Sequence, residues 1–454
     1  MNMNRSLILC GALLAVVSLA SAQPVPFQHD GRPDPDYEVP EELNLHYALL
    51  FALDNNHAIR QARERIREQE GVVVEIRANQ IPNVAVSGSV SGNDDEISSS
   101  LPAQDRNWNV TVQATQVLYA GGGVRAATRS ATLARQAAEL ELQGVINEQL
   151  LAVRTAFYSV LLTQEQVTVQ EENIKLLEGQ LKDAQNRFEA GSVSHFEVLR
   201  AQVALANGQP DLITARNNRR LAVEELRQVI GFTNAAADQA TRLPAFAGNL
   251  EAEDYAAIDL RDAIAAARAN RPELQRLAKL EAAGEEQVVV NRSGSLPQLA
   301  AFGRYDWVRG GPGAGWSDRR DGWTAGLQAQ WNIFDGRATA GRVAQAKSRL
   351  MQTRLALEES QLAIDVEVRR VHSSLTEAWE LVEASGKVVE QADEALRLAK
   401  VRYNAGTATQ LDVLTSQVEL TRAKLNQLQA YFRYNVALAA LRKAMGQPDA
   451  YITG

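Results

Sequence analysis

The sequence predicts a mainly α-helical protein with a small β part, organised as two tandem structural repeats. Three observations lead to this class: an internal duplication with constant spacing, two very long helical patterns, and four short alternating segments. The chain has 454 residues, of which 45% are hydrophobic and 22% are charged. Neither a disordered chain nor a chain buried wholly in lipid has this composition.

The duplication is the strongest of these observations. Residues 187–191 match residues 402–406, which lie 215 positions further along the chain, and the same separation relates Gly231 to Gly446. Solenoids and propellers repeat about every 20–50 residues, so this larger separation indicates two copies of one large unit. We place repeat 1 at 43–231 and repeat 2 at 258–446, with a linker at 23–42, a connector at 232–257 and a tail at 447–454.

Residues 1–22 have the pattern of a secretory signal peptide. Arg5 supplies a positive start, Leu7 to Leu19 are apolar, and Ala20-Ser21-Ala22 predicts cleavage before Gln23. A rival interpretation makes Cys10 the lipid-anchored cysteine of a lipoprotein, but Cys10 lies inside the apolar run. No later stretch reaches the roughly 18 consecutive apolar residues of a transmembrane helix. We therefore expect an exported protein in which any membrane span is built from strands.

Each repeat opens with a helical segment, at 43–80 and 258–295, and continues after its two strands with a much longer helix. Between Gly121 and Gly191 apolar residues recur at steps of three and four without a proline, and the second copy repeats this pattern. About 65 residues at ~1.5 Å each give a helix roughly 100 Å long, which must pack along other helices as in a coiled coil. Pro210 should kink the shorter return helix of repeat 1, because proline removes a backbone donor.

Four segments alternate apolar residues with uncharged polar ones: residues 84–91, 108–118, 299–307 and 323–333. Runs of about 9–11 residues with one apolar face are typical of transmembrane β-barrel strands. The alternative is a half-buried strand of a soluble sheet, but export of the chain and the Gln, Asn and Thr residues on the polar face favour the barrel. Four strands cannot close a barrel, and open edges are not tolerated in lipid, so we expect a homo-oligomer with 4n strands.

Composition and spacing disfavour several other kinds of site. Lys and Arg number 47 and Asp and Glu number 55, a net charge of −8 that argues against nucleic acid as a partner. One Cys and five His, without a His-x-x-x-His pair, leave too few ligands for a zinc or iron–sulfur site. Residues 121–126 fit the dinucleotide pattern Gly-x-Gly-x-x-Ala, but a long helix follows, so we interpret them as a strand-to-helix turn. We predict no enzyme, no cofactor and no metal.

The turns after the two long helices carry the candidate functional residues. Gly191 and Gly406 suit the left-handed position that ends a helix. Residues 194–197 and 409–412 have the pattern of capping boxes, in which Glu197 and Asp412 satisfy amides at a helix start. The same two acids are candidates for a ring of negative charge at a tunnel mouth, and the two roles are compatible. The other candidates pack the turn or dock a partner: Arg187, Phe188, Gly191, Val198, Leu199, Arg402, Tyr403, Gly406, Val413 and Leu414.

Together these features resemble the TolC family of outer-membrane factors. The signal peptide, the duplication and the paired tip pattern R-[FY]-x-A-G-x-x-x-x-x-[DE]-V-L-x-x-Q carry the resemblance, which extends from about Leu43 to Gly446. The resemblance implies a homotrimer in which each protomer gives four transmembrane strands to a 12-stranded β-barrel. It also implies that the long antiparallel coiled-coil helices form an α-helical barrel, a tunnel through the periplasm.

The resemblance further implies a passive exit duct of the cell outer membrane, in contact with its lipid and extending into the periplasm. An inner-membrane pump of the RND or ABC type would drive drugs, toxins or small molecules through the duct by way of a periplasmic adaptor protein. The assembly would be a tripartite efflux pump or a type I secretion system. Asp412 matches a family position whose carboxylates ring the tunnel aperture. Thr415 and Ala408 replace an aspartate and an arginine common in the family, and Gln23 stands where many relatives carry a lipidated Cys.

Two other classes fit part of the pattern. A periplasmic adaptor also has long helical hairpins, but it should carry lipoyl-like and other β-rich domains around a single hairpin. A soluble periplasmic coiled-coil scaffold fits the helices and leaves the strand alternation unexplained. A dependence on detergent separates the channel from both alternatives.

Overall fold

The structure is a computed structural model that describes residues 42–94, 106–232, 245–252, 254–255, 257–310 and 315–447. The predicted signal peptide at residues 1–22, its rival lipid anchor at Cys10, the linker up to residue 41 and the tail from residue 448 lie outside the described residues. The same holds for residues 233–244 of the predicted connector.

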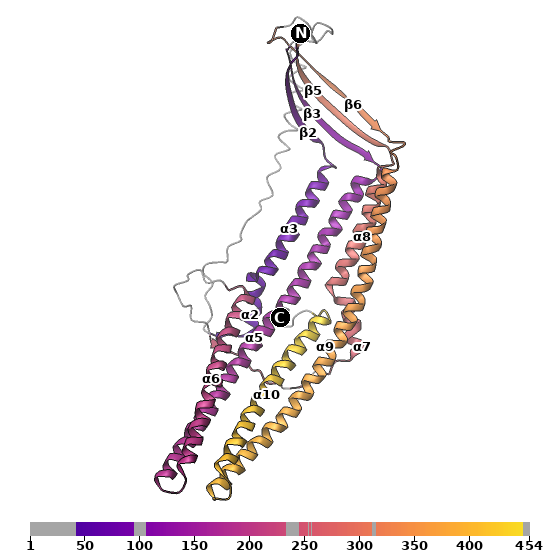
Figure 1. The fold of residues 1–454 in the computed structure, drawn as a ribbon. Coiled ribbons are helices and arrows are strands. Elements are labelled where there is room, and N and C mark those ends of the chain that lie inside the picture. The colour runs from indigo at the N-terminus through magenta and orange to yellow at the C-terminus, as the bar shows by residue number, and fades with distance from the viewer. Residues whose placement is uncertain are drawn as a thin grey trace. The chain divides into compact units, whose positions relative to one another are not determined.

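The elements form two matching sets (Figure 1). Repeat 1 contains, in order, α2 (Leu45–Asn55), α3 (His57–Ala78), β2 (Asn83–Gly92), β3 (Arg106–Ala120), α5 (Gly123–Glu189) and α6 (His195–Ile230). Repeat 2 contains α7 (Leu260–Asn270), α8 (Pro272–Ser293), β5 (Gln298–Arg309), β6 (Arg319–Gln330), α9 (Ala338–Asn404) and α10 (Gln410–Ala444). Every pair of counterparts except β3 and β6 begins 215 residues apart, which confirms the two-repeat prediction.

The long helices are as extended as their sequences predict, because α5 and α9 each run for 67 residues without interruption. Each turns back into a return helix, so α5 pairs with α6 and α9 pairs with α10, and α10 also packs against α5. Nearer the strands, α3, α5, α8 and α9 lie next to one another in that order (Figure 1). Helix α6 continues through Pro210, and the kink expected there stays a prediction.

The helical segment predicted at 43–80 is divided in two at Asn56. This residue adopts an extended conformation, and its side-chain oxygen accepts hydrogen bonds from the amides of Ala58 (2.8 Å) and Ile59 (3.2 Å). A side chain that satisfies the free amides of α3 allows the chain to turn between two helices. In repeat 2 the same joint is formed by Arg271, which is followed by Pro272 at the first position of α8.

Two apolar cores lie at equivalent places in the repeats. The first surrounds Phe157 of α5 and Leu226 of α6, and the second surrounds Leu375 of α9 and Leu441 of α10. A parallel pair of short strands, β1 (Glu42–Leu43) and β4 (Ala245–Phe246), contributes to the first core and was not predicted from the sequence. None of the described helices combines the length and the apolar composition needed to cross a membrane.

The four predicted strands form one antiparallel sheet in the order β2-β3-β5-β6. Strand β6 ends at Gln330, so Trp331 and Ile333, which the alternation assigned to this strand, lie beyond it. Trp331 instead donates a hydrogen bond from its indole nitrogen to the carbonyl of Ser295, just beyond α8 (3.1 Å). Strands β2 and β6 are the edges, each with one neighbour among the described strands.

Candidate functional site

The sheet has one polar face and one apolar face. Residues directly opposite each other in neighbouring strands share a face. One row across the sheet is therefore Ser87, Thr111 and Asp306, and the next row is Val86, Val112, Tyr305 and Trp323. On the edge strands the side chains of the apolar face are strongly exposed, with 70% of Val86, 67% of Trp323 and 68% of Leu327 accessible, and on the inner strands Val112 and Tyr305 are partly exposed. An apolar face of this extent needs an apolar environment that one chain does not supply.

The polar face is lined mainly by Ser, Asn, Thr and Gln. Within the described strands its charged residues are Arg304, Asp306 and Arg320. Arg304 lies 3.1 Å from the Asp306 carboxylate, which also accepts a hydrogen bond from the Thr111 hydroxyl (2.6 Å). This face is suited to contact with water.

At the opposite end of the helices, each hairpin turns through a Schellman motif. Gly191 has φ +72°, and the Ser192 amide donates to the Arg187 carbonyl (2.8 Å). Gly406 has φ +74°, and the Thr407 amide donates to the Arg402 carbonyl (2.9 Å). The left-handed position predicted for both glycines is confirmed.

Of the two capping boxes that the sequence predicts, one is present. The Asp412 carboxylate accepts hydrogen bonds from the Thr409 amide (2.7 Å) and hydroxyl (2.8 Å), and the Asp412 amide donates to that hydroxyl. These bonds, first the one from the Thr409 amide, hold the pKa of the Asp412 carboxyl below its usual value, and Arg402 adds to the effect. The box predicted at Ser194 is wrong, because the Ser194 side chain makes no capping bond.

The acid of the missing box, Glu197, faces the other hairpin instead. Its Oε2 atom is buried and accepts no hydrogen bond from the described residues. Burial is the main cause that raises the pKa of the Tyr403 phenol, and the nearby carboxylates of Glu197 and Asp183 raise it further. Glu197 of repeat 1 and Tyr403 of repeat 2 are therefore close neighbours.

Arg187 joins the two hairpins directly. Its Nη2 atom donates to the side-chain oxygen of Asn404 (2.8 Å), and its guanidinium lies 4.5 Å from the centre of the Tyr403 ring. The same guanidinium pairs with Asp183 on its own helix (2.9 Å). Both partners from repeat 2 lie at the end of α9, so Arg187 holds the tips of α5 and α9 together.

A seam of amide side chains continues this contact away from the tips. Gln417 of α10 is 1% exposed and donates to the side-chain oxygen of Asn173 on α5 (2.9 Å), and Gln180 donates to Gln417. Lys424 of α10, two turns beyond Gln417, pairs with Glu172 of α5 (2.9 Å). This seam was not predicted from the sequence, although a Gln on the apolar stripe of α10 was a usable signal.

The apolar candidates at the tips differ in exposure. Val198, Val413 and Leu414 are buried and pack inside the hairpins. Phe188 and Leu199 are 43% and 46% exposed, which leaves them accessible to a partner. Arg402 is also exposed.

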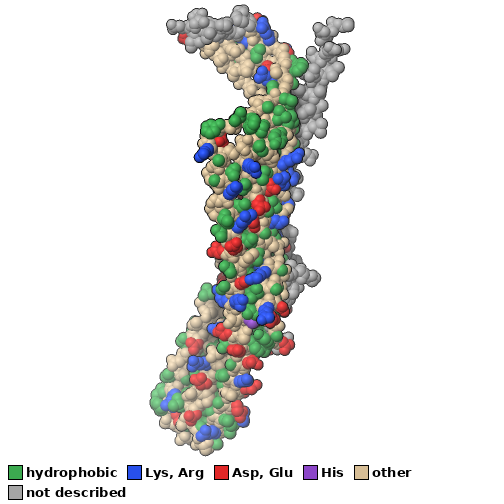
Figure 2. Space-filling model, turned by 90° about the vertical axis from the view of Figure 1, so that its right-hand side faces the viewer, with side chains coloured by type: hydrophobic (Ala, Val, Ile, Leu, Met, Phe, Trp, Pro, Cys, Tyr) green, Lys and Arg blue, Asp and Glu red, His purple; other side chains and the backbone are tan. Residues whose placement is uncertain are grey.

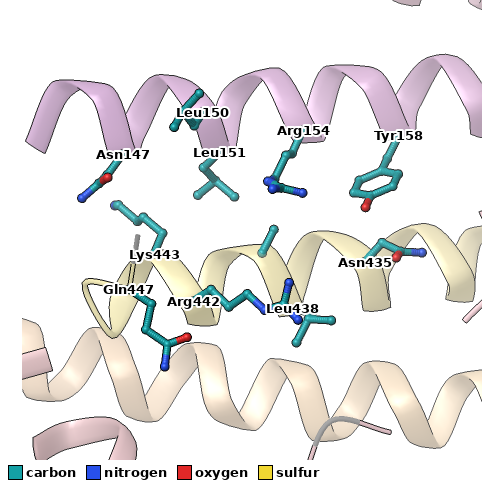
Figure 3. A pocket seen from close by; sticks show the side chains of 11 residues that line it. Asn147, Leu150, Leu151, Arg154, Tyr158, Asn435, Leu438, Arg442, Lys443 and Gln447 are labelled. Carbon is teal, nitrogen blue, oxygen red and sulfur yellow. The ribbon is translucent and has the colours of Figure 1, made fainter. Parts of the chain in front are cut away.

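A small cavity of about 60 Å³ lies halfway along the helices, between α5 and α10 (Figure 3). Arg154, Arg442 and Lys443 make it basic, and Lys443 pairs with Glu148 (2.7 Å) and Glu367 (3.4 Å). Burial alone would raise the pKa of Glu367, but Arg271 and Lys443 outweigh it and hold that pKa below its usual value. This charged cluster joins the two repeats. The described residues contain no group of three or more His, Cys, Asp or Glu placed to hold a metal ion.

Comparison with known proteins identifies the family. Residues 51–232 and 263–447 match the model of the outer membrane efflux protein family. The chain belongs to this family. It is therefore an outer-membrane channel of efflux or secretion systems, not an enzyme, and it extends from the outer membrane into the periplasm. Members of the family form trimers and work with adaptors and inner-membrane pumps.

Individual members of the outer membrane efflux protein family resemble this chain over most of its length. It is 24% identical to the outer membrane efflux protein BepC of Brucella suis over 417 residues, which cover 89% of this chain and 85% of BepC. It is 25% identical to the alkaline protease secretion protein AprF of Pseudomonas aeruginosa over 303 residues, or 66% and 62% of the two chains. The crystal structure of VceC from Vibrio cholerae superposes with a TM-score of 0.74 at 17% identity, covering 89% of this chain and 96% of VceC.

The resemblance to TolC-type channels that the sequence predicts is thereby confirmed. The fold also argues against the periplasmic adaptor, which should have β-rich domains around a single hairpin. Here two hairpins alternate with two pairs of strands. A soluble scaffold does not explain a four-stranded sheet whose apolar face is uncovered.

Proposed function

We propose that three copies of this chain form a passive exit duct, with a closed 12-stranded β-barrel in the outer membrane and a helical tunnel below it. The observation that carries this proposal is the sheet, because it has two open edges and an uncovered apolar face. Unpaired strand edges are not tolerated in lipid, so neighbouring copies must pair β6 with β2. Three copies of four strands match the trimers of the family.

Exposed apolar side chains along α9 support the same assembly. Leu355, Leu362 and Val366 are 55%, 69% and 64% exposed in a single chain. In helices of this length such residues require neighbouring helices. A tunnel formed from several copies supplies these neighbours, and lipid contacts the barrel alone.

The tips of the hairpins are the proposed docking site for a periplasmic adaptor, which links the duct to an inner-membrane pump of the RND or ABC type. A cavity of about 710 Å³ opens between α5, α9 and α10 near the tips. Its walls combine the charged residues Glu172, Lys175 and Lys400 with Tyr403 and Val413. A partly apolar groove with charges of both signs can bind the side of a helical hairpin of the adaptor.

Asp412 is the proposed source of cation preference at the aperture. Replacing Asp412 with Asn removes the charge and keeps an acceptor for the Thr409 amide. In planar bilayers we expect the cation-to-anion permeability ratio to fall by a factor of about five, the effect of ~1 kcal/mol on an ion near the charges. Asp412 is negatively charged at every pH above its lowered pKa. Cation preference should therefore persist in moderately acidic buffer and disappear only as the pH falls through the lowered pKa.

Thr409→Ala is the matched control, because it weakens the capping box and leaves the Asp412 carboxylate in place. The loss of its hydroxyl should raise the pKa of Asp412, so this variant should lose cation preference at a higher pH than the wild type. At neutral pH it should keep that preference. An Asp412→Asn channel with the selectivity of the wild type would contradict the acid ring.

The contacts of Arg187 are the proposed restraint on the closed tips. Arg187→Gln removes the interaction with the Tyr403 ring and the charge-assisted bond to Asn404. Such a bond contributes about 1.5–3 kcal/mol, and a loss of ~1.4 kcal/mol corresponds to a tenfold change in population. We expect the open fraction in single-channel recordings to rise roughly tenfold.

Arg200→Gln provides the comparison for this experiment. Arg200 belongs to the same hairpin, and its guanidinium lies over the Phe196 ring of its own helix, 4.7 Å from the ring centre. The substitution removes an equal charge without touching α9. If the two variants open equally often, the restraint does not reside in the contacts between the hairpins.

A further inference from the structure

Arginine residues surround the places where the strands meet the long helices. Arg77, Arg125 and Arg129 lie at the junction of repeat 1, at the end of α3 and the start of α5. Arg292, Arg337 and Arg342 lie at the junction of repeat 2, at the end of α8 and the start of α9. All six side chains, called here the junction arginines, are exposed.

Most of this charge is not balanced by the chain itself. Arg129 pairs with Glu286 (2.7 Å), and Arg342 lies 3.8 Å from Asp335. The other four junction arginines form no ion pair with a described carboxylate. The first turns of α5 and α9 contain no acidic residue, although the positive end of a helix favours one. Arg125 in the first turn of α5 is therefore unfavourable unless an external anion is present, whereas at the start of α9 the Asp335 carboxylate accepts a hydrogen bond from the Thr339 amide (2.7 Å).

Exposed apolar and aromatic residues border the junction arginines on the side of the sheet. Leu118 and Tyr119 are 53% and 50% exposed in repeat 1, and Trp331, Ile333 and Phe334 are 57%, 82% and 84% exposed in repeat 2. On the face drawn in Figure 2, hydrophobic side chains gather where the strands end, and Lys and Arg side chains lie directly below them. Aromatic residues in such a band mark the level of lipid headgroups.

A hollow of about 520 Å³ lies between α3 and α5 at the junction of repeat 1. Three junction arginines form its rim, and Gln80, Thr128, Thr132 and Leu133 complete its walls. Guanidinium groups at the rim bind phosphate oxygens, and the mainly apolar wall suits the start of an acyl chain. The hollow therefore has the chemistry of a phospholipid headgroup site.

Hydrogen bonds place this hollow beside the apolar face of the sheet. Gln116 lies on the same face of β3 as Val112, and its side chain donates to the Gln80 carbonyl (3.3 Å). Gln80 in turn donates to the Thr128 hydroxyl inside the hollow (2.7 Å). The counterparts of Gln116 and Gln80 in repeat 2 are Trp331 and Ser295, which are also hydrogen-bonded to each other. Both junctions thus adjoin the face that meets lipid.

We propose that the junction arginines bind the headgroups of anionic phospholipids in the periplasmic leaflet of the outer membrane. This inference rests on the proposed duct, because it requires the apolar face to lie in lipid and the helices to lie in the periplasm. Lipid phosphate supplies negative charge at the start of α5, whose first turn has no acidic residue, and adds to that of Asp335 at the start of α9. Bound headgroups fix the depth at which the barrel stops and the tunnel begins.

The test measures lipid preference by native mass spectrometry of the full-length protein in non-ionic detergent, with equal amounts of phosphatidylglycerol and phosphatidylethanolamine. The variant replaces Arg77, Arg125, Arg292 and Arg337 with Gln. Each arginine near an anionic surface contributes about a fivefold preference, so the combined variant should lose the preference for phosphatidylglycerol by more than about tenfold. A second variant with Lys at the same four positions should retain it.

A control variant replaces Arg219, Arg220, Arg261 and Arg370 with Gln, which removes the same charge from exposed positions of α6, α7 and α9. It should keep the lipid preference of the wild type. The proposal is overturned if the junction variant still prefers phosphatidylglycerol, or if the control loses the preference equally. If a neighbouring copy pairs with these arginines instead, the junction variant will dissociate while its lipid preference is unchanged.

Conductance in planar bilayers separates this inference from the proposed function. A junction variant that conducts as the wild type does, but binds both lipids equally, supports the lipid site. Absence of pores in the wild-type protein would reject the proposed duct whatever the lipid measurement shows.

Discussion

Leu327→Arg should prevent assembly of the chain in the outer membrane, whereas Gln328→Arg should be tolerated. Leu327 lies opposite Ala301 on the apolar face of the sheet, and Gln328 lies opposite Ala300 on the polar face. Both side chains are exposed in the single chain, so contacts within the chain do not distinguish the two positions. An arginine facing lipid near the middle of a barrel costs about 2–4 kcal/mol, and three copies multiply this cost.

The amount of trimer in outer-membrane fractions, measured by gel electrophoresis without heating, tests this expectation. The two substitutions add the same side chain at adjacent positions of one strand, so differences in charge or in synthesis cancel. Equal amounts of trimer from both variants would show that the two faces of the sheet meet the same environment. In that case the barrel proposal would be wrong.

The strands illustrate how far alternation in a sequence determines structure. A period of two identifies which residues share a face, and the ladder confirms this for Val86, Val112 and Trp323. Alternation does not show where a strand stops. Trp331 continues the pattern of β6, but its indole donates to the Ser295 carbonyl just beyond α8, and the ladder ends one residue earlier. Interactions with a neighbouring element decided this boundary.

The capping residues show a similar limit. Ser194 and Thr409 precede an acid at the same spacing, yet only Thr409 forms a capping box. Glu197 lies close to Tyr403 of the other hairpin, whereas Asp412 is exposed and caps its own helix. The local sequence pattern is the same in both repeats. The contacts between the repeats make the starts of α6 and α10 different.

The contacts between the two hairpins could not be predicted from the sequence, for a related reason. Gln202 and Gln417 are counterparts in the duplication, but Gln202 is exposed and Gln417 is buried against Asn173. The rotation of each long helix about its axis decides which side meets the neighbouring helix. Periodicity locates the apolar stripe of a helix and does not identify the polar residues that two stripes enclose.

Gly231→Ala should destabilise the fold by about 2–5 kcal/mol. Gly231 ends α6 with φ +78°, and a Cβ atom there would lie 2.7 Å from the Asn55 carbonyl carbon and 3.1 Å from the Asn56 Cα atom. The left-handed conformation costs a non-glycine residue about 1–2 kcal/mol, and overpacking adds about 1–3 kcal/mol. The surroundings cannot easily move, because the Asn56 side chain donates to the Val229 carbonyl (2.7 Å) and ties the end of α6 to the joint between α2 and α3.

Gly122→Ala carries only the conformational part of this cost, because Gly122 has the same φ of +78° and no atom within 4 Å of an added Cβ, so the difference between the two variants is the packing part. Its counterpart in repeat 2 is Arg337, a non-glycine residue with φ 71°, so this backbone position accepts a side chain. Urea unfolding followed by circular dichroism in detergent should therefore show Gly231→Ala to be less stable than Gly122→Ala by about 1–3 kcal/mol. Equal losses would mean that the end of α6 moves away from the joint at little cost. Gly446, which approaches Asn270 and Arg271 in the same way, should then tolerate alanine as well, because the duplication places both glycines in the same role.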